Sequence, residues 1–206
     1  MSEANPSMKF REAMTYAAQL HATQLRKGTS IPYLAHLLSV SSLVLEHGGS
    51  EDEAIAALLH DAIEDQGRDG LTAREIAARF GATVLAIVEG CTDAEGTAGQ
   101  PKPPWRVRKE GYVAHLRHAS AETRLVSAAD KLHNARAILG DLRERGESLW
   151  ARFSGGRDGV LWYYRALVNA YRQSGGSEGM RRLVDELDRT VTQMESLARG
   201  TSTGAA

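Results

Sequence analysis

Apolar residues recur every three to four positions along most of the chain, which is the spacing of one buried face of an α-helix. Over residues 8–27 this pattern is followed by Gly28, a residue common just after a helix end. The pattern recurs over residues 33–47, before Gly48 and Gly49. No segment alternates apolar and polar residues for long enough to predict a strand. The chain is therefore predicted to be all-α.

Capping signals place the next helices. Ser50 and Glu53 have the spacing of a capping box, so a third helix is expected to begin there and to end near Gly67. Thr72 and Glu75 repeat this signal and predict a short helix after it. Further helices are expected over residues 82–90, 105–118, 121–145, 160–172 and 178–197.

The length bounds the architecture. A chain of 206 residues can fill one hydrophobic core, and a single bundle of about eight to ten helices is expected. Residues 1–7 and 199–206 are predicted to be flexible ends around a globular part at 8–198. Residues 93–104 combine glycine, proline and polar residues, which is typical of a loop.

Charge and cysteine content restrict the classes of binding partner and the compartment that the protein would suit. The 25 Lys and Arg residues nearly cancel the 26 Asp and Glu residues, so no overall field favours nucleic acid or a membrane surface. Cys91 is the one cysteine, which excludes an intrachain disulfide and fits a reducing compartment. The N-terminus lacks the apolar region of a signal peptide. We expect a cytoplasmic protein with a small-molecule partner, and the oligomeric state stays open.

Residues 60–65 concentrate potential chemistry in a segment that otherwise has the pattern of a buried helix. Four side chains there could bind metal or exchange protons, and on one continuous helix they would span an arc of roughly 140°. Burying carboxylates beside a core is costly unless a positive charge compensates. A divalent metal ion would supply that charge, so further ligands are expected elsewhere. The four residues are His60, Asp61, Glu64 and Asp65.

Two other segments offer such ligands. His36 lies one turn after Tyr33, and Asp130 interrupts the apolar run of the helix predicted at 121–145. With His60 and Asp61 they form a mixed imidazole and carboxylate set, which suits Mn²⁺, Fe²⁺ or Zn²⁺ with positions left for water. A metal in such a site lowers the pKa of bound water and screens phosphate charge, as phosphoester hydrolysis requires.

Four motifs follow one another within residues 10–170. They are Arg26-Lys27, Pro32-Tyr33-Leu34-Ala35-His36, His60-Asp61-Ala62-Ile63-Glu64-Asp65 and Ala129-Asp130-Lys131-Leu132-His133-Asn134. In order and spacing they resemble the motifs of the HD-domain metal-dependent phosphohydrolases, whose name comes from the adjacent His-Asp pair. The resemblance extends to the branch that hydrolyses guanosine tetraphosphate (ppGpp), and in particular to its stand-alone small alarmone hydrolases.

The resemblance implies a fold, a reaction and residue roles. The fold would be one HD-domain helical bundle, and the reaction would release pyrophosphate and GDP from ppGpp. A Mn²⁺ ion, or another divalent transition metal, would be held by His36, His60, Asp61 and Asp130. Water would be positioned or deprotonated by Glu64 and Asp65. Nucleotide contacts would come from Arg26, Lys27 and Asn134, with Lys131 and Trp162 as further candidates.

Departures from the family pattern leave the substrate open. Leu37 stands where the family usually has proline, and Gln66 where it commonly has threonine. Residues 93–109 and 153–159 also differ from the ppGpp hydrolases. The alternatives are hydrolysis of an adenine alarmone, NADPH or a nucleoside phosphate, a degenerate nucleotide-binding or antitoxin-like module, and a purely structural helical scaffold.

Simpler interpretations of these residues also stand. His60 and Asp61 could form a buried hydrogen-bonded pair, and Asp130 could pair with a core arginine. Arg26 and Lys27 could complement the dipole at the end of the first helix.

Overall fold

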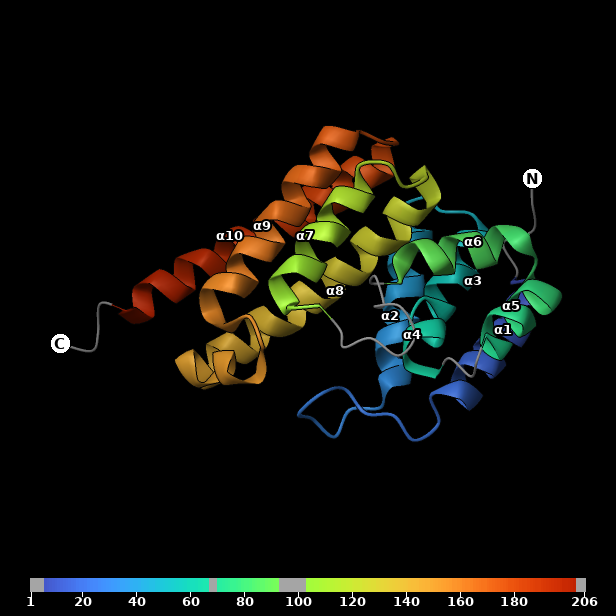
Figure 1. The fold of residues 1–206 in the computed structure, drawn as a ribbon, viewed down its shortest axis with the longest axis horizontal. Helices are drawn as coiled ribbons and strands as arrows, with labels where there is room; N and C mark the ends of the chain where they lie inside the picture. The colour runs from blue at the N-terminus through green and yellow to red at the C-terminus, as the bar shows by residue number, and fades with distance from the viewer. Residues whose placement is uncertain (1–5, 67–69, 93–102, 203–206) are drawn as a thin grey trace. The chain divides into compact units, whose positions relative to one another are not determined.

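The computed structural model describes residues 6–66, 70–92 and 103–202. Within these ranges the regular structure is helical, apart from an isolated β-bridge between Leu25 and Pro32, and Figure 1 shows the helices in chain order. The all-α prediction is therefore confirmed. In chain order the elements are α1 (Met8–Leu20), α2 (Tyr33–Glu46), α3 (Glu51–Leu59), α4 (Ala62–Gln66), α5 (Leu71–Phe80), α6 (Ala82–Cys91), α7 (Trp105–Leu116), α8 (Ala121–Arg145), the 3-10 helix η1 (Gly146–Arg152), α9 (Gly156–Ser174) and α10 (Glu178–Ser202).

The chain divides into two compact units. The first comprises Met1–Thr92 and Ser120–Ala129, and the second comprises Asp93–Ala119 and Asp130–Ala206. The predicted domain boundaries stay a prediction, although α10 continues through Ser202, beyond the predicted start of the tail. Most of the loop predicted at 93–104 lies outside the described residues. None of the described helices is both long and apolar enough to cross a membrane.

Helix α3 forms the centre of the first unit. It packs against α1, α2 and α6, and its residues 54–59 are fully buried. The predicted capping box at its start is confirmed, because the Ser50 hydroxyl accepts from the Glu53 backbone while the Glu53 carboxylate accepts from the Ser50 backbone. The capped N-terminus and the buried apolar residues 54–59 fix α3 in the core. The residue that follows its last turn, His60, is therefore buried as well.

The first helix is shorter than predicted. Helix α1 ends at Leu20 rather than near Lys27, because the chain then turns back on itself. The Arg26 N–H donates to the Ile31 carbonyl at 2.9 Å. Gly28 lies inside this turn with φ +73°, a conformation that favours glycine. Arg26 and Lys27 thus stand on a loop and cannot cap the α1 dipole.

The predicted third helix is interrupted. Helix α3 ends at Leu59 and α4 begins at Ala62, with His60 and Asp61 in the turn between them. The His60 ring contacts the Ala57 carbonyl through Nδ1 at 2.8 Å. In a continuous helix that carbonyl would accept from the Asp61 backbone. A side chain that competes for a backbone acceptor in this way favours a break in the helix.

The second predicted capping box is wrong. Helix α5 begins at Leu71, with Gly70 at φ +75° as the residue before it. The buried Thr72 hydroxyl donates to the Gln66 carbonyl at 2.8 Å, and the Glu75 carboxylate accepts from the Tyr16 hydroxyl at 2.5 Å. Both side chains join α5 to neighbouring elements instead of capping its start.

The second unit is organised around α9, which packs against α7, α10 and η1 and lies beside α10 in Figure 1. Helix α9 begins at Gly156, earlier than predicted, and η1 was not predicted. A Cβ atom at Gly155 would lie 2.7 Å from the Trp105 ring. The indole of Trp105 therefore explains why glycine occupies this position in the unusual run at 153–159.

Helix α8 has the bounds predicted from the sequence, and its first part packs closely on α6. A Cβ atom at Gly90 would lie 2.7 Å from Thr123 Cγ2 and 2.8 Å from its hydroxyl oxygen. Thr123 is buried. The missing side chain at Gly90 therefore lets α6 and α8 approach, which sets the position of the helix that bears Asp130.

Replacing Gly90 with alanine should lower the free energy of unfolding by about 1–3 kcal/mol, because the added methyl overlaps Thr123. Gly111 on α7 has no atom within 4 Å of its Cβ position. Gly111→Ala should therefore raise the free energy of unfolding by about 0.5–1 kcal/mol through helix propensity alone. Urea unfolding of both variants measures the difference, and shifts of the same sign would contradict this account of the α6–α8 contact.

Candidate active site

Three buried side chains converge from separate elements. His36 lies on α2, His60 directly after α3 and Asp130 on α8, and each offers a ligand atom within 4.8 Å of the other two. Their exposed fractions are 1%, 3% and 5%. Asp130 directly follows Ala129, the last residue of the first unit, on one continuous helix. Two imidazoles and a carboxylate at this spacing are a donor set that fits a divalent metal ion.

The His60 ring is oriented for such a role. Its Nδ1 lies 2.8 Å from the Ala57 carbonyl, an acceptor, so the proton belongs on Nδ1. The neutral ring then presents its lone pair at Nε2, as in the usual pairing of a metal-binding histidine with a backbone carbonyl. The His36 and His60 rings pack edge to face at 5.2 Å between centroids.

Asp61 lies against the same imidazoles. Its Oδ2 is 3.0 Å from His60 Nε2 and 3.8 Å from His36 Nε2. The Tyr33 hydroxyl donates a hydrogen bond to this oxygen. Tyr33 entered the sequence analysis only as part of a motif, yet its position one turn before His36 on α2 makes it a direct partner of Asp61.

Asp130 is held by two neighbours on its own helix. Lys131 Nζ donates to Oδ2 and Asn134 Nδ2 donates to Oδ1, each at 2.6 Å. Asn134 lies one turn after Asp130, on the same side of α8. Lys131 is the next residue on the helix and so starts about 100° round from Asp130, but its long side chain still reaches the Asp130 carboxylate. Burial is the largest single influence on the pKa of Lys131 and lowers it, but the Asp130 carboxylate and three nearby tyrosines together outweigh burial, so the pKa stands well above its usual range.

The acidic pair lies on α4, which begins directly after the His60-Asp61 turn. Glu64 is half-buried and Asp65 is exposed. Asp65 Oδ2 accepts a hydrogen bond from Gln24 Nε2 at 2.6 Å. Sequence reasoning missed Gln24, because its contact with α4 depends on the early end of α1.

The remaining candidates lie outside this cluster of ligands. Arg26 is half-buried and Lys27 exposed, both on the loop between α1 and α2. Trp162 is half-buried on α9 in the second unit, where the Arg106 guanidinium lies 3.2 Å from its ring centroid. One face of the Trp162 ring is therefore covered by a cation.

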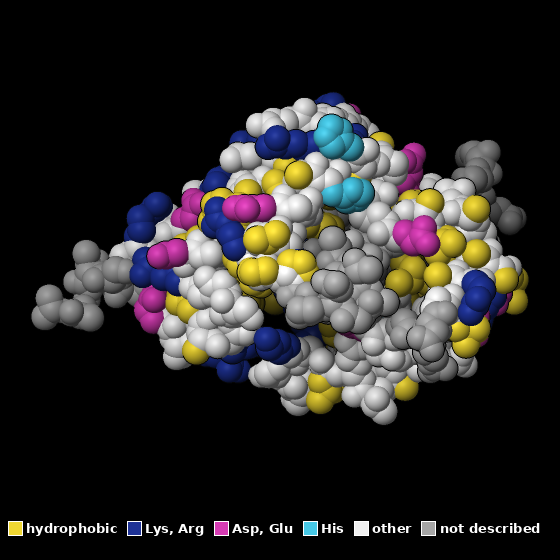
Figure 2. Space-filling model, in the orientation of Figure 1, with side chains coloured by type: hydrophobic (Ala, Val, Ile, Leu, Met, Phe, Trp, Pro, Cys, Tyr) yellow, Lys and Arg dark blue, Asp and Glu magenta, His cyan; other side chains and the backbone are white. Residues whose placement is uncertain are grey.

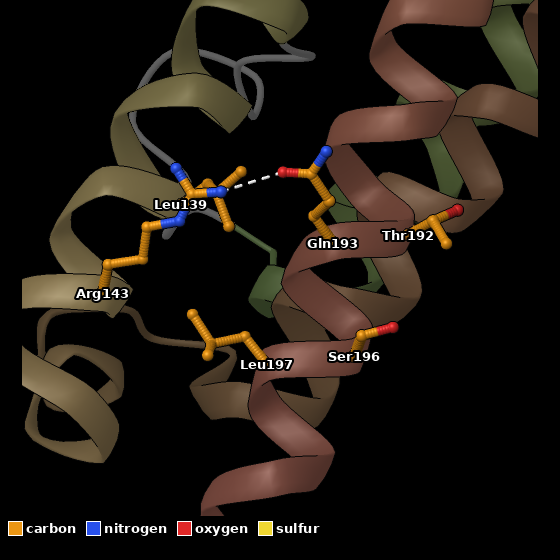
Figure 3. Close-up of a pocket in the computed structure, with 6 residues that line it drawn as sticks. All are labelled: Leu139, Arg143, Thr192, Gln193, Ser196 and Leu197. Carbon is orange, nitrogen blue, oxygen red and sulfur yellow. Dashed lines mark hydrogen bonds between the residues drawn. The ribbon is translucent and has the colours of Figure 1, made fainter.

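A groove in the second unit has a different character. It measures about 510 Å³, and Arg143 Nη2 donates across it to Gln193 Oε1 at 2.9 Å (Figure 3). Its lining comprises Leu139, Arg143, Thr192, Gln193, Ser196 and Leu197. These residues include no carboxylate or imidazole, so the groove lacks the acid–base and metal-binding groups found around His60.

Surface charge in the second unit is mixed. Arg165 pairs with Glu195 at 2.9 Å, and Arg172 pairs with Asp188 at 2.7 Å. In Figure 2 basic and acidic side chains accordingly stand close together over α9 and α10. Interspersed charges of both signs do not form the continuous basic surface that a long polyanion requires.

The family model of the HD domain matches residues 13–161. The chain belongs to the HD domain family. Its likeness to known members is broad: the guanosine-3′,5′-bis(diphosphate) 3′-pyrophosphohydrolase MESH1 of Xenopus tropicalis is 39% identical over 130 residues, which cover 62% of this chain and 68% of that protein. MESH1 of Drosophila melanogaster is 29% identical over 187 residues, covering 89% and 95%.

A solved structure extends the likeness to three dimensions. It is described as a metazoan ortholog of SpoT that hydrolyses ppGpp. It superposes with a TM-score of 0.71 at 28% identity, over 90% of this HD domain chain and 97% of the other. The HD resemblance inferred from the four motifs is therefore confirmed, and the buried cluster His36, His60 and Asp130 has the ligand types that an HD domain uses for a divalent metal.

This HD domain should bind a divalent transition metal through His60. Because losing an outer partner of a metal ligand already costs about tenfold or more in affinity, losing the ligand itself in His60→Ala should cost at least as much. Isothermal calorimetry with Mn²⁺ on chelator-treated protein measures this. His118→Ala, which removes an exposed imidazole, serves as the control. Equal affinities for His60→Ala and the control would rule out this ligand.

Proposed function

We propose that this protein is a Mn²⁺-dependent hydrolase that removes the 3′-pyrophosphate of ppGpp, giving GDP and pyrophosphate. The observation that supports it most is the buried donor set of His36, His60 and Asp130, with Asp61 beside both imidazoles. A relative named for this reaction, MESH1 of Drosophila melanogaster, matches 89% of the chain. The cytoplasm is the proposed compartment, because a chain with a single cysteine fits a reducing environment.

In this proposal His36, His60, Asp61 and Asp130 hold the metal. When bound, Mn²⁺ would lower the pKa of water and offset phosphate charge. The side chains that hold it are themselves braced: His60 by the Ala57 carbonyl, and Asp61 by the Tyr33 hydroxyl. Such outer contacts keep ligand atoms aimed at one point before the ion arrives.

Glu64 and Asp65 would act on the attacking water. Both carboxylates lie on α4, one turn beyond the His60-Asp61 pair, and neither is fully buried. One of them takes a proton as the water oxygen bonds to the phosphorus linked to the 3′ oxygen. The bond from that phosphorus to the 3′ oxygen breaks, and the 3′ oxygen leaves with a proton as GDP forms.

The nucleotide would be bound by cations and polar groups near these elements. Arg26 and Lys27 stand on the loop between α1 and α2, and a guanidinium can both stack on a base and bond phosphate. Lys131 and Asn134 already bond to Asp130, so they support the ligand carboxylate while offering donors to substrate. For a base to stack on the face of Trp162 that Arg106 covers, the guanidinium would have to be displaced.

A panel of nucleotides tests the substrate. With Mn²⁺ the protein should convert ppGpp to GDP and pyrophosphate, and chelation should stop the reaction. An adenine alarmone, NADPH and a nucleoside phosphate should be cleaved more slowly, with products identified by anion-exchange chromatography. Intact ppGpp together with cleavage of another member would refute the proposed substrate. Tight binding without turnover of any member would point to a degenerate module.

Two substitutions separate metal binding from water activation. Asp61→Ala should lose both Mn²⁺ affinity and turnover, because it removes a ligand. Glu64→Ala should keep Mn²⁺ affinity and lose turnover by about 10²–10⁴-fold if Glu64 is the proton acceptor. Calorimetry and steady-state kinetics are the measurements, with Glu89→Ala as a control that removes an exposed carboxylate on α6. Unchanged Mn²⁺ affinity in Asp61→Ala would remove Asp61 from the ligand set.

A further inference from the structure

We infer that Gln24 is a positioning residue for Asp65, and that His21 and Gln66 fix the orientation of the Gln24 amide. This role rests on the proposed function, in which Asp65 belongs to the acidic pair at the attacking water. Gln24 lies on the loop after α1, whereas Asp65 lies on α4, and both belong to the first unit.

The contact between them has one chemically sensible orientation. Gln24 Nε2 lies 2.6 Å from Asp65 Oδ2. An ionised carboxylate accepts hydrogen bonds and donates none, so the amide must present its NH₂ group to Asp65. Hydrogen bonds to a charged acceptor are stronger than neutral ones, and this contact can hold an otherwise exposed carboxylate in one rotamer.

The other end of the amide has two partners. Gln66 Nε2 donates to Gln24 Oε1 at 3.1 Å, and His21 Nδ1 lies 2.6 Å from the same oxygen. Since that oxygen only accepts, Nδ1 of His21 carries the proton. If the amide were rotated by 180°, its oxygen would face the Asp65 carboxylate, and its NH₂ group would face the two donors, His21 and Gln66. The three neighbours therefore select a single orientation of Gln24.

His21 also connects the contacts of Gln24 to the proposed metal ligand Asp61. It is buried, at 2% exposure, and its ring stacks on Tyr33 with centroids 5.4 Å apart. The Tyr33 hydroxyl in turn donates to Asp61. One buried ring thus supports the partner of Asp65 on one side and the partner of Asp61 on the other.

The backbone explains why Gln24 is available for this role. Helix α1 ends at Leu20, and the Gln24 N–H then donates to the His21 carbonyl at 3.1 Å. The Gln24 carbonyl accepts from the Tyr33 N–H at 2.9 Å. With both backbone groups bonded, the side chain extends from a fixed point on the loop toward α4.

Two substitutions of similar length test the inference. Gln24→Met removes the donor, and Gln24→Glu places a second carboxylate beside Asp65. Each should lower kcat for ppGpp by about tenfold or more while leaving KM and Mn²⁺ affinity unchanged, as expected for a group acting through another. Gln19→Glu, an exposed residue on α1, makes the same charge change as a control and should keep wild-type kcat.

A double-mutant cycle separates positioning from folding. In an Asp65→Asn background, Gln24→Glu should cost much less in kcat than it does alone, because the carboxylate it repels is gone. Thermal unfolding and Mn²⁺ calorimetry are run on each variant. Additive losses, or losses of kcat that follow losses of stability or Mn²⁺ affinity, would show a purely structural role and overturn the inference.

Failure of the inference and failure of the proposed function give different results. If the wild-type protein cleaves ppGpp with Mn²⁺ while both Gln24 variants stay within about twofold of its kcat, the inference is wrong and the function stands. If the wild-type protein leaves ppGpp intact under the same conditions, the proposed function is wrong, and the role of Gln24 in that reaction falls with it.

Discussion

Burying charge and imidazole directly after the apolar turns of α3 is the constraint on which the rest of this structure depends. Residues 54–59 of α3 are fully buried, and the residue after its last turn is His60. A polar ring in that position must be satisfied, and the Ala57 carbonyl satisfies one nitrogen. The other nitrogen lies 3.0 Å from Asp61 Oδ2, and His60 offers a ligand atom within 4.8 Å of those of His36 and Asp130. The hydrogen bond to Ala57 therefore has two effects: it satisfies one nitrogen of the buried ring, and it leaves the other nitrogen to act as a ligand.

The same contact shapes the chain that follows. The His60 ring competes for the Ala57 carbonyl, which favours the break between Leu59 and Ala62, where α4 begins. In a continuous helix, the angle between Asp65 and His60 around the helix axis would be fixed by their spacing in the sequence. The break instead lets α4 meet the loop after α1, where Gln24 reaches Asp65. Two departures from regular helix, the early end of α1 and the break after Leu59, together bring this acidic residue and its partner into contact.

Patterns within a short stretch of sequence predicted the features of the fold that depend on interactions between residues close in sequence. The all-α fold, the bounds of α8 and the capping box of Ser50 and Glu53 depend on periodicity and nearest neighbours, and all are confirmed. The Thr72 capping box failed because Thr72 and Glu75 bond to Gln66 and Tyr16, contacts between elements that no local pattern encodes. The site follows the same division. Motifs identified His36, His60 and Asp130, whereas the contact of Tyr33 with Asp61 and that of Gln24 with Asp65 depend on how separate elements pack.

Recognition of the proposed nucleotide, which is highly anionic, would have to be local in this protein. The net charge is −1, and on the second unit basic side chains are paired with acids, as Arg165 is with Glu195. Without a long-range field, attraction acts over about one Debye length, roughly 8 Å at physiological salt. In the proposed reaction, cations such as Arg26, on a loop fixed by its backbone bond to Ile31, would have to contact the phosphates or the base directly. Selectivity would therefore depend on loop geometry more than on charge, whereas the proposed hydrolytic chemistry would depend on the end of α3 and the turn after it.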